Sequence, residues 1–227
     1  MNLETTQLLA LAAALGWASG LRLYAVLFLT GLAGHLGWVA LPPGLQLLQN
    51  PWLLGASGSM LLIEFFADKI PGVDTLWDLV HTLIRIPAGA ALAAAVFGAD
   101  QSTWATAAAL LGGSLAATSH VAKTTTRAAL NTSPEPFPNV AISLLGDATV
   151  PAALWLAFAH PLVALAAVAL ASLAMLAIIV VLIKFLRALW SRLRGDNRPD
   201  ADGRDLAPRV GAGRVSCDSN SNARPLK

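Results

Sequence analysis

The sequence is poor in charge and in cysteine, and each shortage excludes a class of protein. Only 12% of its 227 residues are charged, about half the share in ordinary soluble domains, while 56% are hydrophobic. A water-soluble domain of this length needs more charge to cover its surface, so the chain is not expected to be soluble. Its single cysteine, Cys217, lies near the C-terminus and excludes a disulfide framework or a thiolate metal site within the chain.

Three further absences narrow the class. No basic stripe interleaved with aromatic residues is present, so a nucleic-acid partner is not expected. The first six residues carry Glu4 and no Lys or Arg, which argues against a cleavable signal peptide. Polar and apolar residues do not alternate, which argues against an open sheet and against a transmembrane barrel.

Long apolar runs are what the chain does have. A bilayer core about 30 Å thick needs about 20 apolar residues in helical form, and several segments approach or exceed that length. The patterns predict an all-α, polytopic membrane helical bundle, with the lipid bilayer as its partner, over residues 1–195. A polar tail over 196–227 is predicted to be disordered. The helical segments are predicted at 5–40, 51–69, 73–98, 103–131, 137–160 and 161–190.

Residues at the segment ends indicate an orientation. Tryptophans, which favour the membrane interface, stand near several predicted ends: Trp38, Trp52, Trp104 and Trp190. Basic residues follow the last span: Lys184, Arg187, Arg192 and Arg194. By the positive-inside rule they predict a cytoplasmic C-terminus, whereas the side of the N-terminus is left open.

The order of features hints at an internal repeat of broken helices. The pentamer at 53–57 resembles that at 110–114, and each is followed by a polar helix end and a proline-containing break. A second helix with an internal proline, Pro87 or Pro151, follows each break. The first segment is also long enough to be broken or re-entrant, near residues 16–20. Repeats with broken helices are typical of many transporters, whose sites lie at the repeat interface.

An acidic cluster surrounds the break at 70–72. Its members recur at spacings of three and four on either side of that break, which places them on one face of each helix. They are Glu64, Asp68, Lys69, Asp74, Asp78, His81 and Arg85. Without the histidine their formal charge is −2, four acids against two bases.

A basic cluster follows in the second unit, again at spacings of three and four. It consists of His120, Lys123, Arg127 and Asn131, with a formal charge of +2 when the histidine is left out. Beyond the next break stand Asn139, Ser143 and Asp147, each four residues from the last. The acidic and basic stripes could neutralise each other across a helix interface.

Two interpretations of the clusters stay open. In one, they are structural ion pairs that fix helix register. In the other they line a hydrated cavity, because charges inside a membrane are usually paired or functional. Carboxylates would then hold Mg²⁺, another cation or a proton: Glu64, Asp68, Asp74 and Asp78. Substrate-binding groups would hold an anionic or phosphorylated ligand: Arg22, Arg85, His120, Lys123, Arg127 and Asn131.

These residues favour a transporter or translocase of a small ion, an anionic solute or a phosphorylated lipid. A structural or scaffold protein and a membrane enzyme acting on a lipid phosphate are the alternatives. The aspartate spacing suits such enzymes, but the Asp-Gly start and Ala-Arg step of the CDP-alcohol phosphotransferase motif are missing, as is the Asn-Asp start of the prenyltransferase motif. A homo-oligomer is left open.

Two dense motifs carry a family resemblance. They are Glu64-x3-Asp68-Lys69-Ile70-Pro71-x2-Asp74-x2-Trp77-Asp78-x2-His81-Thr82-x2-Arg85 and His120-x2-Lys123-x3-Arg127-x3-Asn131-x-Ser133-Pro134-Glu135-Pro136-x2-Asn139-x3-Ser143. With residues 18–24 and Leu41-Pro42, they resemble the signature of the domain of unknown function 4126 family, over roughly residues 5–185. The family pattern often has Asn where Arg22 stands and an acidic pair where this chain has Gly146-Asp147. The resemblance implies a bacterial-type inner-membrane protein and brings no activity with it.

Overall fold

A computed structural model describes residues 4–70, 72–98, 101–132 and 137–193; the side chains of Asn139, Arg192 and Leu193 also lie outside the description. The described chain is helical and contains no strand, so the all-α prediction is confirmed. The predicted tail at 196–227 and most of the second proline-containing break lie outside the described residues. The elements are α1 (Thr5–His35), a short 3₁₀ helix η1 (Pro43–Gln49), α2 (Pro51–Ala67), α3 (Val73–Phe97), α4 (Ser102–Leu130), α5 (Phe137–Ala159) and α6 (Pro161–Leu193).

The surface and the interior of the bundle have the polarity of a membrane protein. Helix α3 buries its charged stripe, including Asp78 and Arg85, while Leu79 and Leu83 on its outer face are 69% and 81% exposed. Four described helices are long and apolar enough to span a bilayer, namely α1, α3, most of α5 and most of α6. Burying charge while exposing leucine is favourable only where the surroundings are lipid. The chain is therefore an integral membrane protein.

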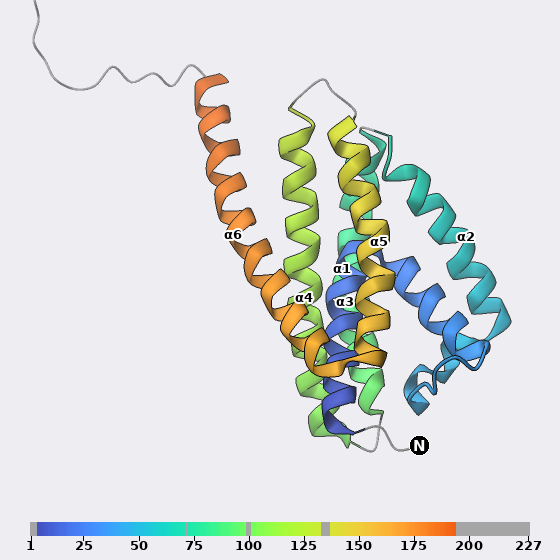
Figure 1. Ribbon diagram of the computed structural model, residues 1–227. Helices are drawn as coiled ribbons and strands as arrows, with labels where there is room; N and C mark the ends of the chain where they lie inside the picture. Colours follow the sequence, from blue (N-terminus) through green and yellow to red (C-terminus); the bar gives the residue numbers. More distant parts are fainter. Residues whose placement is uncertain (1–3, 71, 99–100, 133–136, 194–227) are drawn as a thin grey trace, which may run out of the picture.

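Helix α1 is the centre of the bundle and is broken inside it. Arg22 has φ −148° and ψ 85°, which ends one helical run at residue 21 and lets another start at residue 23. The first run rises from the N-terminus, and the second turns back toward the same end of the molecule (Figure 1). The first run, residues 5–21, has 17 residues and spans about 25 Å, which is less than the thickness of a bilayer core. The break therefore lies within the membrane-embedded part, as the prediction of broken or re-entrant helices required.

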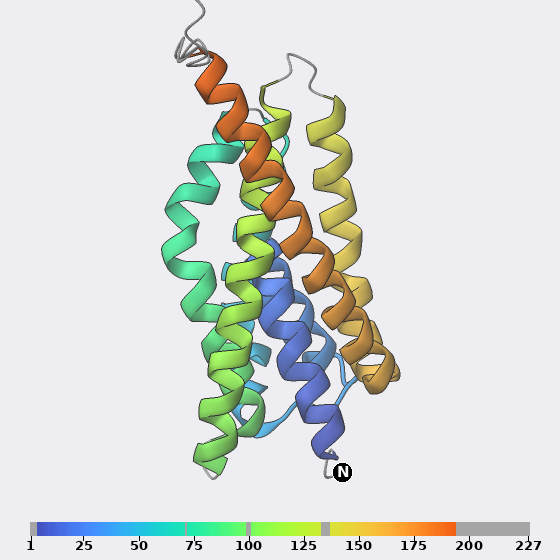
Figure 2. The same ribbon diagram turned by 90° about the vertical axis from the view of Figure 1, so that its left-hand side faces the viewer.

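Glycines, rather than large side chains, bring the central helices together. A Cβ on Gly16 of α1 would fall on the backbone of Gly112 in α4, and one on Gly112 would lie 2.8 Å from the carbonyl oxygen of Gly89 in α3. Small residues of this kind let membrane helices approach closely. Figure 2 shows the first run of α1 between α4 and α6, and α1 packs against both. The predicted break near residues 16–20 is thus a packing site, and the break itself follows at Arg22.

The helix order agrees with the suggested repeat. Helices α2 and α4 run toward one end of the molecule and α3 and α5 run back (Figure 1). Both returning helices carry an internal proline, Pro87 or Pro151. The two helix pairs therefore run in the same directions, and an internal repeat stays a prediction. The N-terminal end of α1 and the last turn of α6 lie at opposite ends of the bundle.

Candidate functional site: a charge network at the broken helix

Ten charged side chains from the two sequence clusters and their neighbours form one network, which is buried except at its outer edge. Five are basic and five are acidic, so their formal charges cancel. The bases are Arg22, Lys69, Arg85, Lys123 and Arg127, and the acids are Glu64, Asp68, Asp74, Asp78 and Asp147. They come from α1 to α5 and from the turn after α2. The acidic and basic stripes do face each other, as their opposite charges suggested.

Asp68 is the most heavily paired acid of the network. Its Oδ2 lies 2.9 Å from Arg22 Nη1, 2.9 Å from Lys123 Nζ and 2.9 Å from Arg127 Nη2. Its Oδ1 accepts a second hydrogen bond, of 3.0 Å, from Arg127 Nη1. Asp68 is therefore clamped by three cations.

The second arm of the network centres on Arg85, which is fully buried. Its Nη2 donates to Glu64 Oε1 and its Nη1 to Asp78 Oδ1, both at 2.6 Å. Asp78 also binds Arg127 at 2.6 Å and Lys123 at 3.2 Å. Asp78 thus joins the Arg85 arm to the Asp68 clamp through the cations of α4.

Neutral groups hold the histidines beside this arm. Thr82 donates to the Asp78 carbonyl, so His120 Nε2, 2.7 Å from the same hydroxyl, is the donor to Thr82. His120 Nδ1 is then the acceptor facing Arg85. On α3, His81 Nδ1 donates to the Trp77 carbonyl at 2.8 Å, and its Nε2 lies 3.2 Å from the Tyr24 hydroxyl. Hydroxyl and carbonyl groups thus hold both rings beside the Arg85 arm.

The break in α1 explains why the network forms where it does. Interrupting a helix leaves carbonyl groups without intrahelical partners. Lys123 Nζ donates to the Leu21 carbonyl at 3.0 Å, and Ser119 Oγ donates to the Trp17 carbonyl at 2.6 Å. The Arg22 side chain projects from the break itself. One stripe of α4 therefore serves both the broken backbone and the carboxylates.

Arg22 also ties the network to α5. Its Nε lies 2.7 Å from Asp147 Oδ1, and its Nη2 donates to Ser143 Oγ at 2.9 Å. Lys69 reaches the other oxygen of Asp147 at 3.0 Å. Asp147 is 21% exposed, so this is the outermost edge of the network.

Unlike the other predicted site residues, Asp74 and Asn131 form their hydrogen bonds with residues at the start of α3. Asp74 Oδ1 accepts hydrogen bonds from the backbone of Gly72 and Thr75, at the start of α3, where an acid also favours the helix dipole. Its Oδ2 is 4.0 Å from Arg127 Nε. Asn131 donates to Thr75 at an exposed position. Asp74 therefore fixes the turn after Gly72, whose φ of 89° suits glycine.

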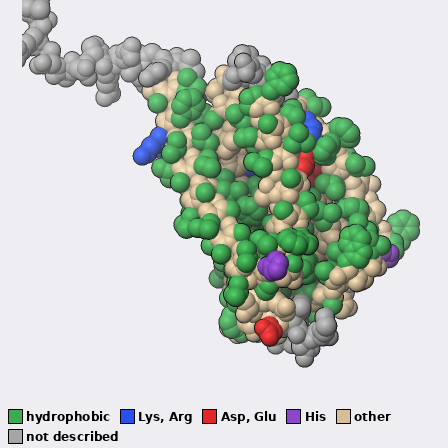
Figure 3. All heavy atoms as spheres, viewed as in Figure 1, with side chains coloured by type: hydrophobic (Ala, Val, Ile, Leu, Met, Phe, Trp, Pro, Cys, Tyr) green, Lys and Arg blue, Asp and Glu red, His purple; other side chains and the backbone are tan. Residues whose placement is uncertain are grey.

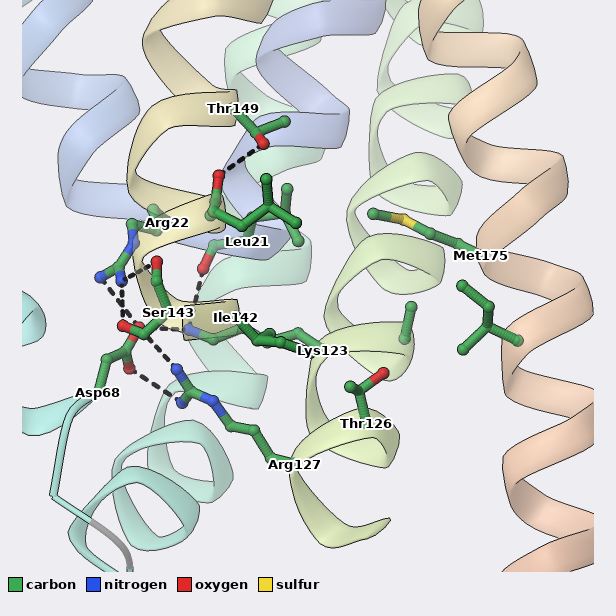
Figure 4. Close-up of a pocket in the computed structure, with 14 residues that line it drawn as sticks. Leu21, Arg22, Asp68, Lys123, Thr126, Arg127, Ile142, Ser143, Thr149 and Met175 are labelled. Atoms are coloured by element: carbon green, nitrogen blue, oxygen red, sulfur yellow. Dashed lines mark hydrogen bonds and ion pairs between the residues drawn. The ribbon is translucent and has the colours of Figure 1, made fainter. Parts of the chain in front are cut away.

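A cavity of about 230 Å³ opens against the Asp68 clamp (Figure 4). Its polar wall is formed by Arg22, Asp68, Lys123, Arg127 and Ser143. Its apolar wall includes Ile142 and Leu145 of α5 and Met175 and Ile178 of α6. The cavity thus joins a charged site to a hydrocarbon-like surface.

The structure brings together most of the residues selected from the sequence. Three members of the network's outer edge stood in the sequence clusters but not among the predicted binding residues, namely Lys69, Ser143 and Asp147. The four-residue spacing of Ser143 and Asp147 was the available signal. Within the described residues, no group of three or more His, Cys, Asp or Glu side chains is arranged to hold a metal ion. The predicted cation or Mg²⁺ site at Glu64, Asp68, Asp74 and Asp78 stays a prediction.

Comparison with known proteins gives one assignment. No match is found among curated proteins or among solved structures. The family model described as domain of unknown function (DUF4126) matches residues 9–183, a stretch that contains α2 to α5 and every member of the charge network. The chain therefore belongs to the DUF4126 family.

Proposed function

We propose that the protein is a transporter or translocase of an anionic substrate in the bacterial inner membrane. The observation that carries the proposal is the clamp on Asp68, where three buried cations share one carboxylate beside a cavity. Asp68 thus fills an anion-binding site with one of the protein's own carboxylates. An incoming anion would find the same ligands by displacing Asp68.

Asp68 stands where such a displacement could begin, at the end of a helix. It follows the last residue of α2, and the Gly72 turn comes four residues later. Helix α2 contacts α1, η1 and α3, and its start lies away from α4 and α5 while its Asp68 end returns to the bundle (Figure 1). A small movement of its end would withdraw Asp68 from the clamp while α1 and α4 stay in place. The site formed by the three cations would then alternate between a state occupied by Asp68 and a state occupied by the substrate anion.

The charges at the end of α6 support an orientation for this cycle. Lys184 and Arg187 belong to the last turns of α6, at the opposite end of the bundle from residue 4. By the positive-inside rule we place the end of α6 in the cytoplasm and the start of α1 outside. Whether the protein works as a monomer or a homo-oligomer stays a prediction.

Phosphate binding to an Asp68→Asn variant tests the proposal. The variant keeps the shape of the side chain but leaves three cations one negative charge short. In neutral detergent at constant ionic strength, we expect it to be less stable than the wild type and to gain more from added phosphate. An anion at about 100 times its Kd would add roughly 2.7 kcal/mol to the free energy of unfolding. Thermal unfolding against a phosphate titration measures this.

Glu64→Gln is the matched control, because it removes the same charge from the other arm of the network. It should respond to phosphate as the wild type does. If phosphate stabilises neither the wild type nor Asp68→Asn, the network binds no anion and the proposal fails.

A scaffold role is the second candidate, and the neutrality of the network favours it. Ten ion pairs among five bases and five acids need no ligand to balance them. In that case Asp78→Lys and Lys123→Asp would each prevent folding, and the double swap would restore it without any response to anions. Independent tolerance of the two changes would exclude the scaffold role.

A further inference from the structure

We infer that the substrate anion is the headgroup of an amphipathic molecule, a phosphate monoester carried on a long apolar chain. The inference rests on the proposed function and specifies its substrate class. It is carried by the two-sided lining of the cavity beside Asp68.

The two sides of the cavity suit the two parts of such a molecule. Arg22, Asp68, Lys123 and Arg127 gather on one side in Figure 4, and Met175 of α6 lies across the cavity from them. Further apolar residues of the lining are Leu21, Ile142 and Leu145. A small inorganic anion would use the first side and leave the second without a role.

The polar side has enough donors for a phosphate. Arg22 and Arg127 each present a planar fork of N–H groups, Lys123 adds an ammonium and Ser143 adds a hydroxyl. The three cationic side chains are 8% exposed or less. Arginine forks match phosphate oxygens in pairs, and a phosphate monoester offers three terminal oxygens. A carboxylate, with two oxygens, uses fewer of these donors.

The size of the cavity limits what it encloses. At about 230 Å³ it is smaller than the roughly 300–1,000 Å³ of pockets that surround a whole drug-sized ligand. A headgroup and the first carbons of its chain fit, and the rest of the chain must lie outside. Hydrophobic side chains cover most of the face that carries α5 and α6 (Figure 3), and α6 is largely exposed. The bilayer itself would therefore hold the remainder of the chain.

Thermal unfolding of the full-length protein in neutral detergent tests the inference with four probes. They are dodecyl phosphate, dodecanoate, dodecanol and inorganic phosphate. We expect dodecyl phosphate to stabilise the protein at concentrations at least about tenfold lower than inorganic phosphate, the factor supplied by burying about two methylenes. Dodecanoate should act more weakly and dodecanol should have no effect, since it lacks the charge.

Met175→Trp, which fills the apolar side of the cavity, should abolish the advantage of dodecyl phosphate and keep the response to inorganic phosphate. Leu173→Trp is the matched control, because Leu173 is on the same helix and 64% exposed. It should behave like the wild type.

The outcomes separate the two proposals. Equal potency of dodecyl phosphate and inorganic phosphate, or an unchanged advantage in Met175→Trp, would overturn the amphipathic substrate and leave the anion transporter standing. A stronger effect of dodecanoate than of dodecyl phosphate would overturn the phosphate headgroup. If no anion stabilises the protein, both proposals are wrong.

Discussion

At the scale of single residues, the network depends on which partner each charge has. Glu64 is fully buried and pairs with Arg85 at 2.6 Å, whereas Asp78 is shared among Arg85, Lys123 and Arg127. Removing one cation therefore affects the acids unequally. A buried charge that loses its partner costs far more than an exposed one.

We expect Arg85→Met to lower the free energy of unfolding by about 3–5 kcal/mol, the usual cost of breaking a buried pair from one side. Adding Glu64→Gln should restore a large part of that loss, since it removes the charge that Arg85 balanced. Chemical denaturation in detergent measures both changes. Leu83→Ala, at an 81% exposed position on the same helix, is the control. A double variant as unstable as the single one would contradict the pairing.

Arg22 shows what residue type alone can predict about a contact and what it cannot. It is the only Lys or Arg within residues 5–40, and the sequence placed it among the groups that would hold an anionic ligand. The structure gives it two carboxylate partners, Asp68 and Asp147, and the hydroxyl of Ser143. Its role in binding substrate stays a prediction. No spacing rule links residue 22 to residue 147, because the contact depends on how α1 and α5 pack.

At the scale of helices, close backbone approach at glycines, rather than contact between large side chains, holds the centre of the bundle together. Gly16, Gly89 and Gly112 bring α1, α3 and α4 into backbone contact. That approach puts the stripe of α4 within reach of the broken end of the first run of α1. The helix interface and the charge network are therefore parts of one arrangement.

Gly112→Ala tests this interface, with Gly55→Ala as the same change in open space. A Cβ on Gly112 would fall on the Cβ of Ala93 and lie 2.8 Å from the Gly89 carbonyl oxygen, whereas one on Gly55 meets nothing within 4 Å. We expect Gly112→Ala to destabilise the protein by about 1–3 kcal/mol through overpacking. Gly55→Ala should be neutral or stabilising by up to about 1 kcal/mol. Thermal unfolding compares them, and equal effects would refute the close approach.

Helix positions were the most predictable feature at this scale. The predicted segment 51–69 is α2 at Pro51–Ala67, and 137–160 is α5 at Phe137–Ala159. Hydrophobic runs and proline breaks mark such ends locally. The 3₁₀ helix η1 was missed, because a short run of Leu, Gln and Pro has no distinctive period. The break at Arg22 was missed by a few residues, because glycines serve packing as well as bending.

At the scale of the whole molecule, the two ends of the bundle make a testable topology. The first described residues and the last turn of α6 are at opposite ends (Figures 1 and 2). These two helix ends should therefore lie on opposite sides of the membrane, and the positive-inside rule predicts the cytoplasmic side for the end of α6.

Cysteine labelling checks this topology with little engineering, because Cys217 is the single cysteine of the sequence. In intact spheroplasts, a membrane-impermeant maleimide should leave Cys217 unlabelled and should label Thr5→Cys in a Cys217→Ser background. Permeabilised cells should show labelling of both. Labelling of both sites from outside would mean that the termini share a side, and the proposed orientation would be wrong.

The sequence by itself determined the class of protein, the helical segments and the two opposite stripes of charge. These depend on composition and on periods of three and four, which are local properties. Only the tertiary structure decided that Asp68 is clamped by three cations, that Asp74 belongs mainly to the start of α3, and that a cavity joins the clamp to α6. Those facts depend on distances between helices far apart in the chain, and helical periodicity does not encode which stripe another will face.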